Sequence, residues 1–193
     1  MAGLSLHDRL EQARRQQFVG RVGERERLRA VLSEPELPFF VLHLFGPGGL
    51  GKTSLLREYG YIAREMGIPS VTLDGRNFDA SPAGFLSALA PALRLPADAD
   101  PVAHLAERPE RLLLLVDTYE LLAPIDVWLR EEFLPALSGN VFVVLAGRQP
   151  PAAPWRIDPG WQTMMRVLPL RNLSPNESRD FLERRREPEA QID

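Results

Sequence analysis

The sequence predicts an α/β fold in which a parallel sheet lies between two layers of helices. Short apolar segments alternate along the chain with longer segments whose apolar residues recur at helical spacing. The short segments are apolar at successive positions, as is typical of strands that are covered on both faces. Strands and helices in this alternation predict parallel strands joined by helical crossovers. We therefore expect a three-layer α/β/α sandwich.

Five segments have the length and composition of strands. Residues 39–45 (FFVLHLF) are apolar at nearly every position, which predicts a central strand. Residues 111–117 (RLLLLVD) are similarly apolar and end in an acid. In chain order, the predicted strands are 39–45, 69–74, 111–117, 141–146 and 165–169.

Helices are predicted before, between and after these strands. Residues 82–94 place Phe85 and Leu89 on one helical face. Ser174 is a suitable N-cap with Pro175 at the first helical position and Glu177 at the third, which predicts a last helix. The other predicted helices are 4–17, 23–33, 52–65, 102–107 and 125–137.

The Pro-rich segment 149–161 is predicted to be a loop. Trp155 and Trp161 lie within it. Large aromatic rings are mostly buried, so we expect the two tryptophans to anchor this segment to the core. An exposed pair would instead indicate a surface for a partner.

The composition excludes several classes of protein. The 193-residue chain has a net charge of −3 and no cysteine, which excludes a disulfide scaffold or a cysteine-based zinc site. His7, His43 and His104 lack metal-ligand spacing. The apolar stretch 37–45 is too short to cross a membrane, and the first residues do not resemble a signal peptide. We expect a cytoplasmic protein without membrane contact, whose acidic balance disfavours direct nucleic-acid binding by this domain.

One residue count points to a specific role. Of the 23 basic residues, 22 are arginine and the single lysine is Lys52. A lysine ammonium is a compact point charge, whereas a guanidinium is a broad planar fork. A lysine that persists in so arginine-rich a chain indicates a function that arginine cannot fulfil.

Lys52 lies in a phosphate-binding motif. Residues 46–53 (GPGGLGKT) follow the first predicted strand and fit the pattern G-x-x-x-x-G-K-[ST] of the P-loop. Glycines let successive N–H groups point at one phosphate, and the following helix presents its positive end to the same anion. A Gly-rich turn without a ligand is the alternative. The predicted nucleotide contacts here are Gly46, Pro47, Gly48, Gly49, Leu50, Gly51, Lys52, Thr53 and Ser54.

Two oxygen ligands for Mg²⁺ are predicted beside this loop. The Thr53 hydroxyl is expected to bind the ion directly. Asp117 ends the third predicted strand, at the position of the Walker B acid, and a buried acid there requires a cation or hydrogen-bond donors. The alternative is that Asp117 only caps the next turn.

Further charged residues follow the strands at the same edge of the sheet. Glu120 could orient or deprotonate the attacking water, or it could be a solvated acid. Arg148 follows the fourth strand and could contact the γ-phosphate, or it could be a surface arginine. Asp74 and Arg76 follow the second strand, and without a clear partner we favour a structural role for both.

These motifs resemble those of the signal-transduction ATPases with numerous domains (the STAND class), which are related to AAA+ ATPases and include the NACHT and NB-ARC proteins. Residues 18–24 (FVGRVGE) resemble the N-terminal motif of that class. Residues 46–53 match its Walker A motif and 112–117 its Walker B motif. Arg148 matches its sensor-1 arginine, and 168–177 resemble the segment that leads to its next domain.

The resemblance has several implications. It implies that Val19, Gly20 and Arg21 pack near the adenine and ribose of ATP, that Mg²⁺ accompanies the nucleotide, and that the strand order is 5-1-4-3-2. It favours ATP over GTP, since the sequence contains no Asn-Lys-x-Asp motif. It also implies further domains of a longer protein, and nucleotide-dependent self-association, as partners.

The sequence departs from this class at two places. Many members carry a second acid after the Walker B aspartate, where this chain has Thr118, so Glu120 is the nearest candidate for the catalytic acid. The helical lid and winged-helix region of the class have no counterpart here. We expect an N-terminal helix over 1–17, an ATPase core over 18–185 and a tail over 186–193, as in a core taken from a longer protein.

The function expected from these observations is a nucleotide-dependent regulatory switch that binds ATP and hydrolyses it slowly to ADP and phosphate. One alternative is a module that holds nucleotide with little or no hydrolysis. Another is an AAA+ ATPase of the DNA origin-binding or loader type. A P-loop kinase would need an acceptor pocket and lid arginines, and Arg148 speaks against it.

Overall fold

A five-stranded parallel sheet forms the centre of the computed structural model, which describes residues 5–96 and 98–186. The strand order is β2-β3-β4-β1-β5, which confirms the predicted order and the α/β/α fold class. The strands are β1 (Val41–Phe45), β2 (Ser70–Asp74), β3 (Leu112–Asp117), β4 (Val141–Gly147) and β5 (Met165–Pro169).

Burial follows the position of each strand in the sheet. The inner strands β3 and β4 are buried along their whole length, and β1 is buried except at its last residue. The edge strands β2 and β5 have several exposed residues. All pairs are parallel, so the carboxyl ends of the strands meet at one edge of the sheet, where Asp74 is in register with Asp117 and Phe45 with Gly147.

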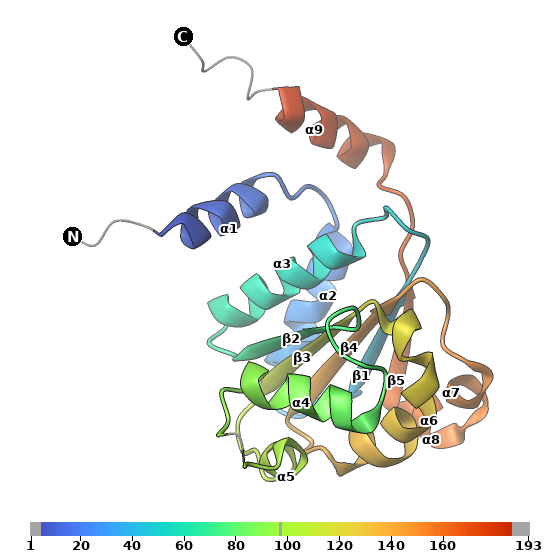
Figure 1. Cartoon of the computed structure of the whole chain (residues 1–193). Coiled ribbons are helices and arrows are strands. Elements are labelled where there is room, and N and C mark those ends of the chain that lie inside the picture. Colours follow the sequence, from blue (N-terminus) through green and yellow to red (C-terminus); the bar gives the residue numbers. More distant parts are fainter. Residues whose placement is uncertain (1–4, 97, 187–193) are drawn as a thin grey trace.

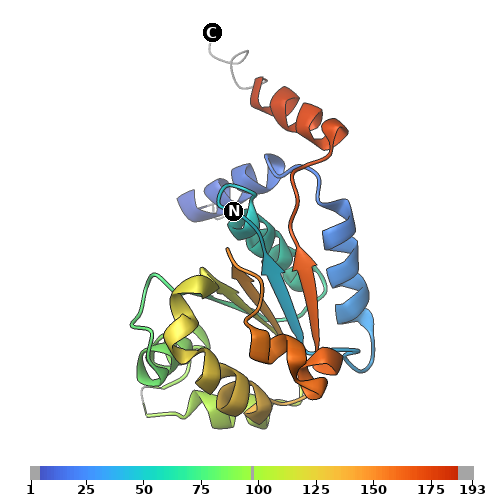
Figure 2. The same ribbon diagram turned by 90° about the vertical axis from the view of Figure 1, so that its right-hand side faces the viewer.

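Helices cover both faces of the sheet, as Figures 1 and 2 show. On one face, α2 (Val22–Ser33) and α3 (Lys52–Glu65) pack against Leu44 and Leu115 of the strands. On the other face lie α4 (Pro82–Ala92), α5 (Pro101–Ala106) and the segment after β3. Each layer has its own apolar cluster, because side chains of a strand point alternately to the two faces.

In place of the single helix predicted over 125–137, the structure has an irregular segment that begins earlier, at Tyr119. It consists of the 3₁₀ helix η1 (Tyr119–Ile125), the single α-turn α6 (Asp126–Trp128), the π-turn η2 (Leu129–Phe133) and the 3₁₀ turn η3 (Leu134–Ala136). Pro124 and Pro135 explain the irregularity, because proline donates no backbone hydrogen bond and crowds the carbonyl four residues before it.

The predicted loop 149–161 contains two short helices, α7 (Ala153–Ile157) and α8 (Pro159–Met164). Asp158 caps α8 by accepting a hydrogen bond from the backbone N–H of Trp161 at 3.0 Å. Two of the prolines that suggested a loop, Pro154 and Pro159, therefore lie in the first turns of helices, a position that proline tolerates. Trp155 is fully buried and its ring lies 4.8 Å from that of Trp161, which confirms the predicted anchoring.

Two helices lie outside the sandwich at the carboxyl edge of the sheet (Figure 1). α1 (Leu6–Gln16) contacts α3, because Tyr61 donates a hydrogen bond to the Glu11 carboxylate. α9 (Pro175–Arg186) begins with the predicted capping box, in which Ser174 and Glu177 exchange hydrogen bonds. Most of the predicted tail, 187–193, lies outside the described residues. None of the helices in the described part is long and apolar enough to span a membrane.

Candidate functional site

The loop between β1 and α3 leaves an open cradle at the carboxyl edge of the sheet. Gly49 and Gly51 have φ angles of 83° and 82°, a region in which side chains other than glycine are strained. A Cβ atom added to either would meet no atom within 4 Å in the described part of the chain. The loop therefore curls by virtue of its glycines and keeps its backbone accessible.

Lys52, the first residue of α3, reaches back across this loop. Its Nζ donates hydrogen bonds to the carbonyl oxygens of Gly46 at 2.6 Å and Pro47 at 2.8 Å. The ammonium group thus lies over the loop, where it can exchange these carbonyls for phosphate oxygens. The N-terminus of the 14-residue helix α3 adds free N–H groups and a positive dipole at the same place.

The residues predicted to hold Mg²⁺ lie side by side. Thr53 Oγ1 donates a hydrogen bond of 2.7 Å to Asp117 Oδ2, joining the start of α3 to the end of β3. Asp117 is 6% exposed and its other oxygen accepts from the Thr118 N–H at 2.8 Å. A hydroxyl and a carboxylate suit Mg²⁺, which usually takes one or two protein oxygens besides phosphate and water. The described residues contain no group of three or more His, Cys, Asp or Glu side chains that would hold a metal without such phosphates.

Glu120 and Arg148 form a pair beside this site. Arg148 Nε lies 3.0 Å from Glu120 Oε1, and the Arg148 backbone N–H donates to Glu120 Oε2 at 3.2 Å. Glu120 is on η1 and Arg148 directly follows β4, so the contact joins two neighbouring connections. The Arg148 side chain is 68% exposed, which leaves it free to reorient toward a ligand.

Asp74 and Arg76, which the sequence left without a partner, are bound to each other, and Asp74 also contacts the residue that follows the Walker B segment. Arg76 Nη2 lies 2.5 Å from Asp74 Oδ2, and this hydrogen bond is the main reason that the pKa of Asp74 is lowered. Thr118 Oγ1 is 3.2 Å from Asp74 Oδ1. The carboxylate is therefore attached to the residue that follows Asp117.

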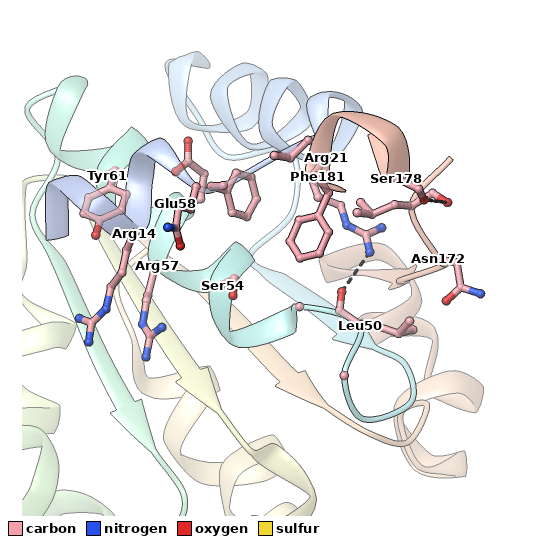
Figure 3. Close-up of a pocket in the computed structure, with 16 residues that line it drawn as sticks. Arg14, Arg21, Leu50, Ser54, Arg57, Glu58, Tyr61, Asn172, Ser178 and Phe181 are labelled. Carbon is pink, nitrogen blue, oxygen red and sulfur yellow. Dashed lines mark hydrogen bonds between the residues drawn. The ribbon is translucent and has the colours of Figure 1, made fainter. Parts of the chain in front are cut away.

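A cavity of 720 Å³ adjoins the phosphate-binding loop (Figure 3). Its walls come from α1, the segment before α2, the start of α3 and α9, and Phe181 projects from α9 toward it. The lining combines aromatic rings with polar side chains, as small-molecule sites usually do. Of the residues predicted to bind nucleotide, the cavity is lined by Val19, Arg21, Gly49, Leu50, Gly51 and Ser54.

A contact between Arg21 and Glu177 joins the segment before α2 to the start of α9 beside this cavity. Arg21 Nη2 donates to the Leu50 carbonyl at 3.0 Å, and its backbone N–H donates to Glu177 Oε1 at 2.8 Å. Hydrogen bonds from Ser174 are the main cause of the lowered pKa of Glu177, which keeps this acceptor ionised. Gly20 has φ 72°, and a Cβ there would lie 2.5 Å from Glu177 Oε1, so glycine is required for this approach.

No protein-family model matches this chain, and no curated protein matches it. Many solved structures resemble it. The chain resembles Cdc6p of Pyrobaculum aerophilum with a TM-score of 0.63 and 20% identity, over 89% of this chain and 52% of Cdc6p. It resembles Orc1 of Aeropyrum pernix, solved in complex with DNA, with a TM-score of 0.64 and 20% identity, over 89% and 50%.

A third similar structure is the replication initiator DnaA bound to AMPPCP and single-stranded DNA. Its TM-score is 0.52 at 15% identity, over 91% of this chain and 53% of DnaA. These neighbours are AAA+ P-loop ATPases, and the chain spans about half the length of each. The fold is therefore that of the P-loop NTPases, with AAA+ proteins as structural neighbours.

Sequence reasoning missed two parts of this site. It named Thr118 only as a departure from a motif, and it did not connect Thr118 with Asp74. It also did not place Phe181 or Arg57 at the cavity. The position of Asp74 at the end of a strand was a usable signal, but its contact with Thr118 depends on the pairing of β2 with β3.

Proposed function

We propose that this chain is an ATP-binding domain that hydrolyses ATP slowly and acts as a nucleotide-dependent regulatory switch. The observation that carries the proposal is the 2.7 Å hydrogen bond between Thr53 and Asp117 beside the loop covered by Lys52. Thr53 and Asp117, as ligands for Mg²⁺, lie next to a phosphate-binding loop. A nucleoside triphosphate requires both of these features for binding. The fold shared with Cdc6p and Orc1 supports this assignment.

Each part of the site has a role in binding. The loop 46–51 and Lys52 hold the β- and γ-phosphates, with Pro47 and Gly48 at the turn of the loop. Thr53 and Asp117 hold Mg²⁺, which neutralises charge on the phosphates when bound. The cavity beside Leu50 and Ser54 receives the adenosine, and Val19 and Arg21, on either side of Gly20 in the chain, form its wall before α2.

Hydrolysis is attack of a water molecule on the γ-phosphorus, with ADP as the leaving group. Lys52 stabilises the charge that develops on the transferred phosphoryl group. Arg148 contacts the same group and senses whether it is present, and Glu120 holds Arg148 at the site through the contacts at 3.0 and 3.2 Å. In this proposal Glu120 is also the nearest candidate for the acid that orients or deprotonates the attacking water.

The switch arises from the position of α9. Glu177 attaches the start of this helix to Arg21 at the wall of the cavity, so a bound nucleotide and α9 share a border. γ-Phosphate contacts that order such elements and release them after hydrolysis are a common switching mechanism. In this proposal the STAND-like domain works in the cytoplasm, regulates further domains of a longer protein and self-associates with nucleotide bound.

Calorimetric titration of Mg-ATP into the chain, followed by measurement of phosphate release, tests the proposal. We expect binding by the wild type and loss of binding in Lys52→Ala by about 30-fold or more, because two phosphates lose their cation. Arg64→Ala is the matched control, since Arg64 is an exposed cation in the last turn of the same helix. Wild-type binding that Lys52→Ala leaves unchanged would contradict the proposal.

The phosphate assay separates the switch from the nucleotide-holding module. Phosphate release by the wild type that is lost in Lys52→Ala supports the ATPase. ATP binding without phosphate release favours the nucleotide-holding module. Glu120→Gln is expected to lower phosphate release if Glu120 serves the attacking water or Arg148.

A DNA-handling ATPase is the second candidate function. The observation that favours it is the similarity to Orc1, a structure solved in complex with DNA. The net charge of −3 disfavours DNA contacts by this part of the chain. Binding to a DNA duplex that weakens steeply as the salt concentration rises would support this candidate over the regulatory switch.

A further inference from the structure

We propose that the outer edge of β2 binds an extended acidic segment of a partner protein as an added strand. The site lies outside the nucleotide cavity, and the inference does not rest on the proposed binding of ATP. Backbone groups of β2 supply hydrogen bonds to the partner, and arginines beside the strand supply charge.

β2 is an edge strand whose outer backbone groups lack a partner in the described part of the chain. It pairs only with β3, and the Leu113 N–H donates to the Pro69 carbonyl at 2.9 Å. Alternate residues face the partner in a parallel pair, so the N–H and C=O groups of Ser70 and Thr72 point away from β3. Outside the sheet ladder, no backbone hydrogen bond of the described residues involves either of them. Such an edge is open to pairing with another chain.

A groove of about 900 Å³ runs along this edge. It is lined by α3, the turn into β2, the first residues of β2 and the end of α4. α3 and α4 cover opposite faces of the sheet, so the groove borders the strand on both sides (Figure 1). Ser70 and Thr72 are both exposed within it. Leu56, Ile68 and Leu93 add apolar surface against which side chains of a partner can pack.

The groove has a surplus of positive charge. Glu11 is the single acid among its described lining residues, and the Glu11 carboxylate is already paired with Arg14. The arginines of the groove include Arg57, Arg94 and Arg108. No hydrogen bond or ion pair with a described residue engages the guanidinium of Arg57 or Arg94. Because the chain as a whole carries a net charge of −3, this local excess marks a surface that complements an acidic partner.

Arg94 occupies a position that usually selects glycine. It follows the C-cap of α4 with a left-handed φ of 58°. Its N–H donates to the Pro91 carbonyl at 2.9 Å, and the N–H of Leu95 donates to the Ala90 carbonyl at 3.0 Å. These two bonds define a Schellman motif, in which the left-handed residue is most often glycine. α3 ends with Gly67 at the same position, with φ 73°. An arginine that strains the backbone here indicates a use for its side chain at the groove.

A single-stranded nucleic acid is the other polyanion that these arginines could attract. Its backbone has no amide groups to continue the ladder of β2. Proteins that bind such strands also stack the bases on aromatic rings, and Tyr61 is the one ring among the described lining residues. The groove therefore fits an acidic peptide better than a nucleic acid.

Fluorescence anisotropy with the full chain and a labelled peptide of repeated Glu-Glu-Val tests the proposal. This repeat places acids on both faces of a strand. We expect the peptide to bind about 10-fold more tightly than the matching Lys-Lys-Val peptide. A Glu-Glu-Val peptide methylated at its backbone nitrogens keeps the charges and loses the donors, so it is expected to bind about 10-fold more weakly. A wild-type chain that does not bind the Glu-Glu-Val peptide, or that binds the methylated form equally well, would overturn the proposal.

Substitutions at Thr72 test the backbone contribution from the side of the protein. Thr72→Pro removes the N–H that points away from β3 and costs no bond of the sheet, and edge strands accept proline in this orientation. We expect peptide binding to weaken by about 10-fold. Thr72→Val keeps the N–H and is the matched control, with binding within about 2-fold of the wild type. Equal binding by the two variants, both folded by circular dichroism, would show that no strand is added.

Arg94→Gly tests the contribution of charge with little risk to the fold. Glycine suits the left-handed backbone, so stability is expected to be kept or raised. The Glu-Glu-Val peptide is expected to bind about 5-fold more weakly, because a carboxylate loses its guanidinium. Arg27→Ala, at an exposed arginine of α2, is the control. Equal losses of affinity in Arg94→Gly and Arg27→Ala would reduce the effect to general charge attraction and contradict the proposal.

The outcome is independent of the proposed function and separates a peptide from a nucleic acid. The peptide assays contain no nucleotide, so a chain that fails to bind Mg-ATP can still confirm the strand addition, and the reverse also holds. A single-stranded oligothymidylate is the competing probe. If it binds the wild type more tightly than the Glu-Glu-Val peptide, and if Arg94→Gly weakens it but Thr72→Pro does not, the groove binds nucleic acid and the inference is wrong.

Discussion

Among single residues, Thr53 carries the contact from which most of the site follows. Thr53→Val keeps the side-chain shape and removes the hydroxyl that donates to Asp117 at 2.7 Å. Asp117 is 6% exposed and loses one of its partners, so the free energy of unfolding is expected to fall by about 1 kcal/mol. The affinity for ATP is expected to depend less on Mg²⁺, because the ion loses one of its two proposed protein ligands.

Chemical denaturation and calorimetric titration with and without Mg²⁺ measure these two effects. Thr72→Val is the matched control, since it makes the same change at an exposed position of β2 away from the loop. A Thr53→Val protein whose affinity still rises with Mg²⁺ as in the wild type would argue against Thr53 as a ligand.

The sequence singles out the residues of the candidate site, but not all of the contacts between them. Lys52, Thr53 and Asp117 stand out because a local motif or a strand end marks each of them. The contact between Asp74 and Thr118 could not be predicted in this way. It depends on which strands are neighbours and on the left-handed backbone of Thr118, and no local pattern in the sequence specifies either.

Among the helices, α9 is held by a contact between Glu177 and the backbone of Arg21, and this contact depends on glycine at position 20. Gly20→Ala would place a Cβ 2.5 Å from Glu177 Oε1 on a backbone with φ 72°. The left-handed conformation alone costs a non-glycine residue about 1–2 kcal/mol, so the contact between Arg21 and Glu177 is expected to break. Glu177→Ala removes the same contact from the other side.

Both variants are expected to weaken Mg-ATP binding by about 3- to 10-fold, because α9 forms part of the cavity wall. Hydrogen exchange of the backbone amides in 175–186 measures the release of the helix. Glu183→Ala, at an exposed position of α9, is the control. Unchanged exchange in both variants would mean that Glu177 does not hold this helix.

The success of prediction differed between elements for a physical reason. The five strands were found within two residues of their bounds, because segments of five to seven residues bounded by turn signals are too short for buried helices. The segment 119–136 was misjudged at its start and in its type. Its apolar residues recur at helical spacing, but Pro124 and Pro135 interrupt the hydrogen-bond ladder and break the helix into short turns.

For the molecule as a whole, a buried histidine on the central strand predicts loss of stability in mild acid. His43 on β1 is 1% exposed, and burial lowers its pKa from 6.5 to about 4. Between these two values the unfolded chain binds a proton that the folded chain does not, so stability falls as the pH is lowered from about 6.5 to about 4. The shift corresponds to a loss of about 3 kcal/mol at the lower end.

Urea denaturation midpoints of the wild type and His43→Leu between pH 7.5 and pH 4 measure this contribution. The carboxylates of the chain titrate in both proteins, so the difference in slope isolates the histidine. We expect His43→Leu to lose less stability than the wild type over this range, whatever its stability at pH 7.5. Because His43 lies on the strand that leads into the phosphate-binding loop, nucleotide binding is expected to fail in acid together with the fold. Parallel slopes in the two proteins would show that His43 is protonated equally in the folded and unfolded chains.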